Sequence, residues 1–319
     1  MFTKPTRRLP TEILLLIRNW IDPSDLRTHV CYYLSSRMVA GLYNSEEDAD
    51  EFWELACWYC GLGLTPSDED AGRSWKDIAI ECIKADGFCT LSGCGESLLC
   101  HNRQEMEQAI YHHDLAPLDV YLDADHGVVF QIHSALEKLR FIGGRGAPLL
   151  QDATFSDTAC GRLPFFEGNR WALGAHPLLY RSFATFAPST KMMLRPVAGR
   201  LLEGHRLSRT NALTIYDVVN TIHADLDRPL TVQNLVEYVR THQSCLPKDL
   251  AQSYLGPLQR LQSLRDLLRI CPTKEYAHVA DDDEHGPIFV TFLACTAENE
   301  PHDDTTMQCC EPETVSSQL

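Results

Sequence analysis

Four side chains of the types that bind zinc lie between residues 89 and 101. They are Cys89, Cys94, Cys100 and His101, with Cys82 nearby. Zinc takes thiolate and imidazole ligands, but the spacing Cys-x4-Cys-x5-Cys-His is not that of a standard zinc finger. Adjacent residues on a helix point about 100° apart, so Cys100 and His101 cannot both face one ion from a regular helix. We therefore predict structural thiols and no bound metal, with a zinc site as the alternative.

Two further groups have the composition of reactive sites. Cys57-x-x-Cys60 has the spacing of a redox pair, but no thioredoxin-like strand precedes it, and its Trp- and Tyr-rich surroundings predict a core helix. His112, His113 and Asp114 are acid–base groups, but no Ser or Cys accompanies them in a recognisable nucleophile elbow. The chain is therefore expected to be neither an enzyme nor a cofactor-binding protein.

Composition limits the possible partners. The chain has 319 residues, of which 44% are hydrophobic and 23% charged, as in globular proteins. Its net charge of −16 argues against nucleic acid as a partner, although eleven of its acids lie in residues 275–319, which contain no Lys or Arg. No run approaches the roughly 18 apolar residues of a membrane helix, and none resembles a signal peptide. The sequence thus predicts a soluble, intracellular protein with no membrane partner and with reduced cysteines.

The hydrophobic periodicity predicts an α+β fold, with an N-terminal all-α helical module followed by a mixed α/β C-terminal domain. Helices are expected over residues 9–60 (with a polar break at 44–50), 74–85, 96–113, 214–226, 231–242 and 248–270. Strands are expected over residues 117–123, 128–132, 192–197 and 288–293, with a turn at 87–95 and an acidic loop at 281–284. The predicted parts are a helical module (1–62), a helical and Cys-rich connector (63–115), a hairpin and linker (116–160), an α+β recognition domain (161–295) and a disordered acidic tail (296–319).

The first expected helix, after Pro10, is apolar on more than one side. Leu15 lies about 200° from Ile13 around the helix axis, and Leu16 lies near 300°. A short helix of this kind is either buried within its own domain or docks on a partner. The face predicted to be core consists of Ile13, Leu14, Ile17, Trp20 and Ile21.

Residues 9–26 resemble the F-box family. The family pattern begins Leu-Pro-x-Glu-Leu/Ile, continues with an Ile four residues on and an aliphatic residue four beyond that, and ends in Asp-Pro-x-Asp-Leu. The Val30-Cys31 pair and the segment 52–55 also match the family, although a tryptophan usual soon after Val-Cys is absent and 45–51 resembles an insertion. The nine matching positions are Leu9, Pro10, Glu12, Ile13, Ile17, Ile21, Pro23, Asp25 and Leu26.

The resemblance implies a module that docks on a Skp1-type adaptor of a cullin–RING ubiquitin ligase, while the downstream region recruits an unknown protein substrate. That downstream region is similar to fungal F-box-like proteins, through residues 74–79, 176–178 and 214–218. The alternative is a non-ligase interaction or structural protein in which these helices are only part of the core; exposure of Leu9, Pro10 and Leu15 separates the two. The residues expected to contact the adaptor are Leu9, Pro10, Ile13, Leu15, Ile17, Ile21, Pro23 and Leu26.

Overall fold

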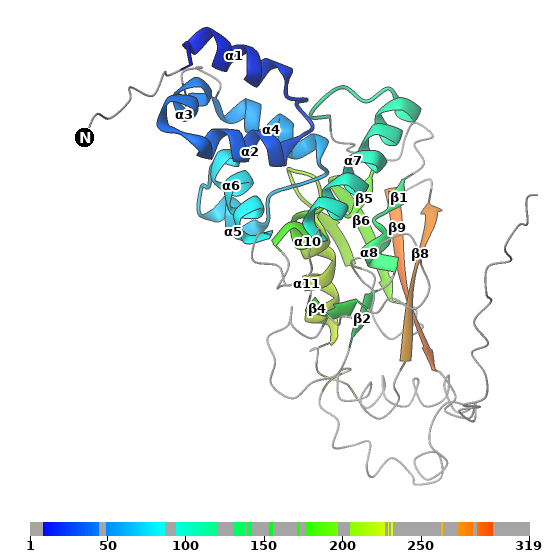
Figure 1. The fold of residues 1–319 in the computed structure, drawn as a ribbon. Coiled ribbons are helices and arrows are strands. Elements are labelled where there is room, and N and C mark those ends of the chain that lie inside the picture. The colour runs from blue at the N-terminus through cyan, green and yellow to red at the C-terminus, as the bar shows by residue number, and fades with distance from the viewer. Residues whose placement is uncertain are drawn as a thin grey trace, which may run out of the picture.

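The chain has an α+β fold, with helices in its N-terminal part and most strands in its C-terminal part (Figure 1). The structure is a computed structural model. It describes residues 9–44, 49–86, 94–119, 130–137, 139–141, 153–155, 171–172, 177–196, 205–226, 229, 231, 263, 273–282 and 286–295.

Local capping signals set the starts of several N-terminal helices. The Asp25 side chain accepts a hydrogen bond from the Thr28 N–H, and the Ser74 hydroxyl accepts one from the Asp77 N–H. The structure confirms the helices expected at 74–85 and 96–113. The N-terminal helices are α1 (Thr11–Trp20), α2 (Leu26–Ser35), α3 (Arg37–Asn44), α4 (Ala49–Tyr59), α5 (Pro66–Asp70), α6 (Trp75–Asp86) and α7 (Cys94–His113).

The described strands form three sheets. β1 (Gln131–Ile132) pairs antiparallel with β5 (Thr185–Phe186). A second sheet has the order β2 (Leu139–Phe141), β3 (Ala153–Phe155), β4 (Trp171–Ala172). The third has the order β7 (His205–Ser208), β6 (Lys191–Pro196), β9 (Gly286–Cys295), β8 (Thr273–Asp282), in which β6 and β9 run parallel. The remaining described helices are α8 (Ser134–Glu137), α10 (Pro177–Arg181) and α11 (Ile215–Leu226).

Three predicted elements of the C-terminal half are confirmed, and the predicted acidic loop at 281–284 is wrong where the structure describes it. The strands expected at 192–197 and 288–293 correspond to β6 and β9, and the helix expected at 214–226 corresponds to α11. Asp281 and Asp282, expected in a loop, end β8 and pair with Pro287 and Gly286.

The predicted hairpin of residues 117–132 is also corrected where the structure describes it. Residues 117–119 lie in a turn, and the partner of β1 is β5, about fifty residues later in the chain. A pairing of such long range leaves no local signal. The predicted helices at 231–242 and 248–270, the tail at 296–319, and most of the turn at 87–95 lie outside the described residues.

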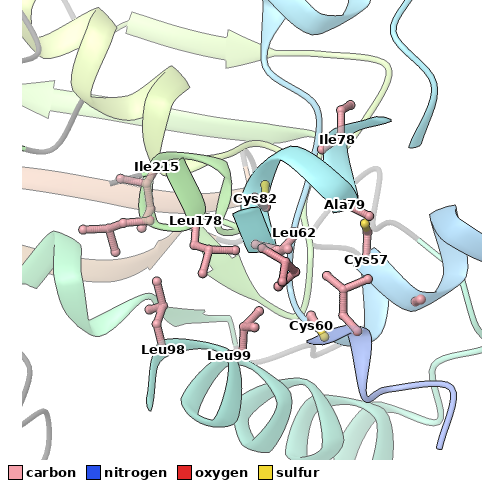
Figure 2. Close-up of a cluster of buried hydrophobic side chains, with 14 of the residues drawn as sticks. Cys57, Cys60, Leu62, Ile78, Ala79, Cys82, Leu98, Leu99, Leu178 and Ile215 are labelled. Carbon is pink, nitrogen blue, oxygen red and sulfur yellow. The ribbon is translucent and has the colours of Figure 1, made fainter. Parts of the chain in front are cut away.

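One hydrophobic core joins the helical part to residues that follow much later in the chain (Figure 2). Cys57, Cys60 and Cys82 all lie in it, at 1% exposure or less. Burial raises the pKa of Cys57 well above its usual value, and it raises the pKa values of Cys60 and Cys82 to about 12 and about 11. These residues therefore act as small apolar side chains, as predicted for Cys57-x-x-Cys60. Leu178 and Ile215 belong to the same core, which therefore spans the predicted boundaries at 62 and 160.

Candidate functional site

An exposed apolar stripe runs along one face of α1 and the residues before it. Spacings of three and four residues place its members on one side of the helix. Each is at least 40% exposed, and Trp20 is 88% exposed. A contiguous group of large apolar side chains in contact with water is a mark of an interaction surface. This apolar stripe consists of Leu9, Ile13, Leu16, Ile17 and Trp20.

The opposite side of α1 attaches the helix to the body through Leu14 and Arg18, the two residues of α1 that are buried. The Tyr32 hydroxyl donates to the Leu14 carbonyl at 2.9 Å, and Arg18 Nη1 donates to the Leu42 carbonyl at 3.2 Å. Burial is therefore centred on Leu14 and Arg18. Of the predicted core face, Leu14 is buried and Ile21 is half-buried, whereas Ile13, Ile17 and Trp20 are exposed.

Arg18 lies on a group of aromatic rings formed by α2, α3 and α4. Its guanidinium carbon is 4.7 Å from the centroid of the Tyr43 ring and 5.1 Å from that of Phe52. Cation–π attraction of this kind is worth more where the charge is desolvated. It explains why an arginine, rather than Ile17 or Trp20, faces inward. We call these rings the aromatic platform: His29, Tyr33, Tyr43, Phe52 and Trp53.

The structure separates the predicted adaptor-contacting residues into two groups. Ile21 is half-buried, and Leu26, which was predicted to contact the adaptor, is buried in the core at 1% exposure. Leu26 begins α2, directly after the N-cap residue Asp25, and lies in the main hydrophobic core. Leu16 and Trp20 were missed, although the spacing of apolar residues at 9, 13, 16, 17 and 20 is a signal for one face. The predicted residues that are exposed are Leu9, Pro10, Ile13, Leu15, Ile17 and Pro23.

The candidate zinc ligands that the structure describes diverge. Cys100 is exposed and lines an open cleft of about 300 Å³ beside the start of α2. The ring of His101 turns to another element, where its Nε2 lies 3.1 Å from the Ser134 hydroxyl. The described part of the chain contains no group of three or more potential metal ligands, while Cys89 and the Cys94 side chain lie outside it.

One group of side chains has the arrangement of a catalytic triad, with Ser134 as the nucleophile, His101 as the base and Glu105 as the acid. His101 Nδ1 is 3.9 Å from Glu105 Oε1, on the far side of the ring from Ser134. Acyl transfer also requires donors for an oxyanion, usually including the N–H after the nucleophile. Here the Ala135 N–H donates to His133 Nδ1 at 3.0 Å, so that donor is already used. The geometry therefore does not favour catalysis at Ser134.

A buried polar chain joins α7 to the C-terminal half. Since the Ala135 N–H donates to His133 Nδ1, the proton of this neutral ring is on Nε2, which donates to Asn102 Oδ1 at 3.0 Å. The Asn102 amide donates to the Ser182 hydroxyl at 2.9 Å, and that hydroxyl donates to the Leu178 carbonyl at 3.0 Å. Asn102, His133 and Ser182 are fully buried, so the chain fixes elements in place.

A buried ion pair, which we call the Asp68–Arg181 pair, connects α5 to α10 across 113 residues of sequence. Arg181 Nε and Nη2 each donate to a carboxylate oxygen of Asp68 at 3.1 Å, and both side chains are at most 3% exposed. Thr65 and Arg73 donate to the same carboxylate. Neighbouring Glu69 pairs with Arg209 at 2.6 Å. The short helix α5 is thereby held by two arginines of the C-terminal half.

Acidification should weaken the fold through Asp68. Burial by itself would raise the pKa of Asp68, but hydrogen bonds from Arg181 and Thr65 outweigh it and lower this pKa from 3.8 to about 2. A carboxylate with a depressed folded-state pKa stabilises the fold above the unfolded value, and this contribution is lost as pH falls from 3.8 toward 2. Between pH 5 and pH 3 we expect the wild type to lose about 1 kcal/mol through this group.

Urea denaturation of the wild type and Asp68→Asn at both pH values measures this contribution. The difference in unfolding free energy between the two proteins should shrink at pH 3. An unchanged difference would show that Asp68 has an ordinary pKa in the folded chain.

Comparisons with known proteins gave no match to a protein-family model, to a curated protein or to a solved structure. No helix in the described ranges is long and apolar enough to cross a membrane.

Proposed function

We propose that the chain is an F-box-like substrate-recognition adaptor of a Skp1–cullin–RING ubiquitin ligase. It docks on a Skp1-type adaptor through α1 and recruits a protein partner through its C-terminal part. The observation that carries the proposal is the exposed apolar stripe of Leu9, Ile13, Leu16, Ile17 and Trp20, which coincides with the segment that resembles the F-box pattern.

Burying the apolar stripe against a partner would lower the free energy. Removing one large apolar side chain from water is worth about 1.5–3 kcal/mol. A helix whose role was internal packing would turn five such side chains inward, whereas α1 turns in Leu14 and Arg18. The most exposed member is Trp20, and tryptophan is enriched among the residues that dominate binding energy at protein interfaces.

The alternative is a protein in which these helices only form part of the core. It requires Leu9, Pro10 and Leu15 to be covered by the rest of the chain. All three are exposed, with Leu9 at 54% and Leu15 at 37%. Their exposure favours a docking role.

The aromatic platform supports docking by setting the rotation of α1. Because Arg18 is drawn onto Tyr43 and Phe52, the helix faces that are 140° or more away from Arg18 point outward. This places Ile13 and Trp20 toward solvent. A partner therefore meets a stripe that is oriented before binding, which lowers the ordering cost of association.

Binding of purified chain to a purified Skp1-type adaptor, measured by calorimetry, tests the proposal. We expect a one-to-one complex for the wild type. Trp20→Ala should weaken it by about 30-fold, since a dominant interface residue contributes about 2 kcal/mol or more. Trp20 is so exposed that the change should barely affect folding.

Tyr111→Ala is the matched control, because Tyr111 is an equally prominent aromatic residue (84% exposed) on α7. It should bind as the wild type does. A wild-type chain that forms no complex with the adaptor would refute the ligase role, and equal losses in the two variants would refute docking through α1.

A further inference from the structure

A buried histidine lies beneath the anchored side of α1. His29, on α2, is 1% exposed, and its Nδ1 lies 2.8 Å from the Tyr43 hydroxyl oxygen. Its ring centroid is 4.9 Å from that of Phe52 and 5.9 Å from that of Tyr43, with both contacts edge to face. These are the same two rings that hold the Arg18 guanidinium, so Arg18 and His29 share one small aromatic site.

The groups around His29 favour its neutral form. Burial is the largest influence and lowers the pKa of His29 below its usual 6.5, and the Arg18 charge acts in the same direction. Three groups in the turn before α2 act in the opposite direction: the backbone of Asp22 and the carboxylates of Asp22 and Asp25. They raise the pKa of His29, but by less than burial and Arg18 lower it. On the α3 side burial raises the pKa of Tyr43 to about 12, so its hydroxyl stays neutral; Phe52 on α4 cannot titrate.

We propose that His29 is an acid-sensitive latch for α1, whose protonation expels Arg18 from the aromatic platform and detaches the helix. An imidazolium would place a second cation against two rings that already hold a guanidinium, in a site with little water to screen the repulsion. The attachment of α1 is sparse, because Leu14 and Arg18 are its buried residues. A modest penalty at Arg18 is therefore enough to shift the balance between attached and detached helix.

The direction of the pH effect follows from the linkage between protonation and attachment. When α1 is attached, His29 has a pKa below 6.5; when α1 leaves, the ring gains access to water and its pKa returns toward 6.5. The detached state then binds more protons, so attachment is strongest above pH 6.5 and weakens as pH falls below it. The equilibrium changes by at most about tenfold for each pH unit below 6.5. The latch itself does not depend on the proposed function, but its consequence does: in acid the apolar stripe would lose its orientation for docking.

Hydrogen exchange of the full chain, followed by mass spectrometry, tests the latch. The readout is the protection of the α1 amides at pH 7.5 and pH 5.5, corrected for intrinsic exchange rates. In the wild type we expect protection to fall by up to about tenfold at pH 5.5. His29→Phe, whose ring cannot take a proton, should show no such fall, and His112→Gln, which replaces an exposed histidine of α7, should behave as the wild type does.

Unchanged wild-type protection between the two pH values overturns the proposal, and so does an equal fall in His29→Phe. Should His29→Phe lose its native circular dichroism, His29→Gln serves the same purpose, because its side chain is also uncharged at both values. The experiment contains no adaptor. Its failure therefore leaves the docking proposal standing, and failure of adaptor binding leaves the latch testable.

Discussion

Replacing Arg181 with methionine is expected to lower the free energy of unfolding by about 3–5 kcal/mol, because it leaves a buried carboxylate without its main partner. Asp68 is 2% exposed and receives two hydrogen bonds from Arg181. Arg73 remains at 3.0 Å, but it is partly exposed and bonds only one oxygen of Asp68. The measurement is urea denaturation at pH 7, followed by tryptophan fluorescence.

Arg103→Met is the matched control for this loss. Arg103 Nε lies 3.7 Å from Glu107 Oε1, and the two side chains are 36% and 63% exposed, so removal of Arg103 should cost less than about 1 kcal/mol. Adding Asp68→Asn to Arg181→Met should recover part of the lost stability, since no buried charge then remains unpaired. A cost for Arg181→Met no larger than that of Arg103→Met would show that α5 and α10 are not joined by the Asp68–Arg181 pair.

A loss of similar size, about 3–5 kcal/mol, is expected for Trp53→Ala, which leaves a cavity at the centre of the aromatic platform. Trp53 is fully buried, stacks on Tyr43 at 5.3 Å, and meets Tyr33 and Phe52 edge to face. Aromatic pairs contribute about 0.5–1.5 kcal/mol each beyond the area that they bury. Thermal or urea denaturation measures the loss.

Trp53→Phe separates the ring from its polar atom. The indole Nε1 is buried and makes no hydrogen bond within the described part of the chain, so the smaller ring removes an unsatisfied donor while retaining an aromatic contact. We expect Trp53→Phe to cost less than about half as much as Trp53→Ala. If Trp53→Ala unfolds at the wild-type denaturant concentration, Trp53 does not support the platform, and the orientation of α1 requires another cause.

The sequence by itself determined the features that depend on neighbouring residues. Ser74 and Thr214 precede α6 and α11 and accept hydrogen bonds from Asp77 and Asp217, three residues on, so these helix starts were readable as local signals. The segments 192–197 and 288–293 were likewise expected to be strands, and they correspond to β6 and β9. The apolar character of α1 and its likeness to the F-box pattern could also be predicted, because both depend on residues that are close together in the sequence.

Only the tertiary structure decided which face of α1 is buried. Periodicity gives the angle between two side chains of a helix, but not the rotation of the helix against its neighbours. That rotation follows from Arg18, whose partners Leu42, Tyr43 and Phe52 lie 24 to 34 positions further along the chain. For the same reason, the sequence pattern could not predict that Asp68 pairs with Arg181 or that β1 pairs with β5. Each depends on contacts that exist only after distant segments have packed, so no neighbouring residue carries their signal.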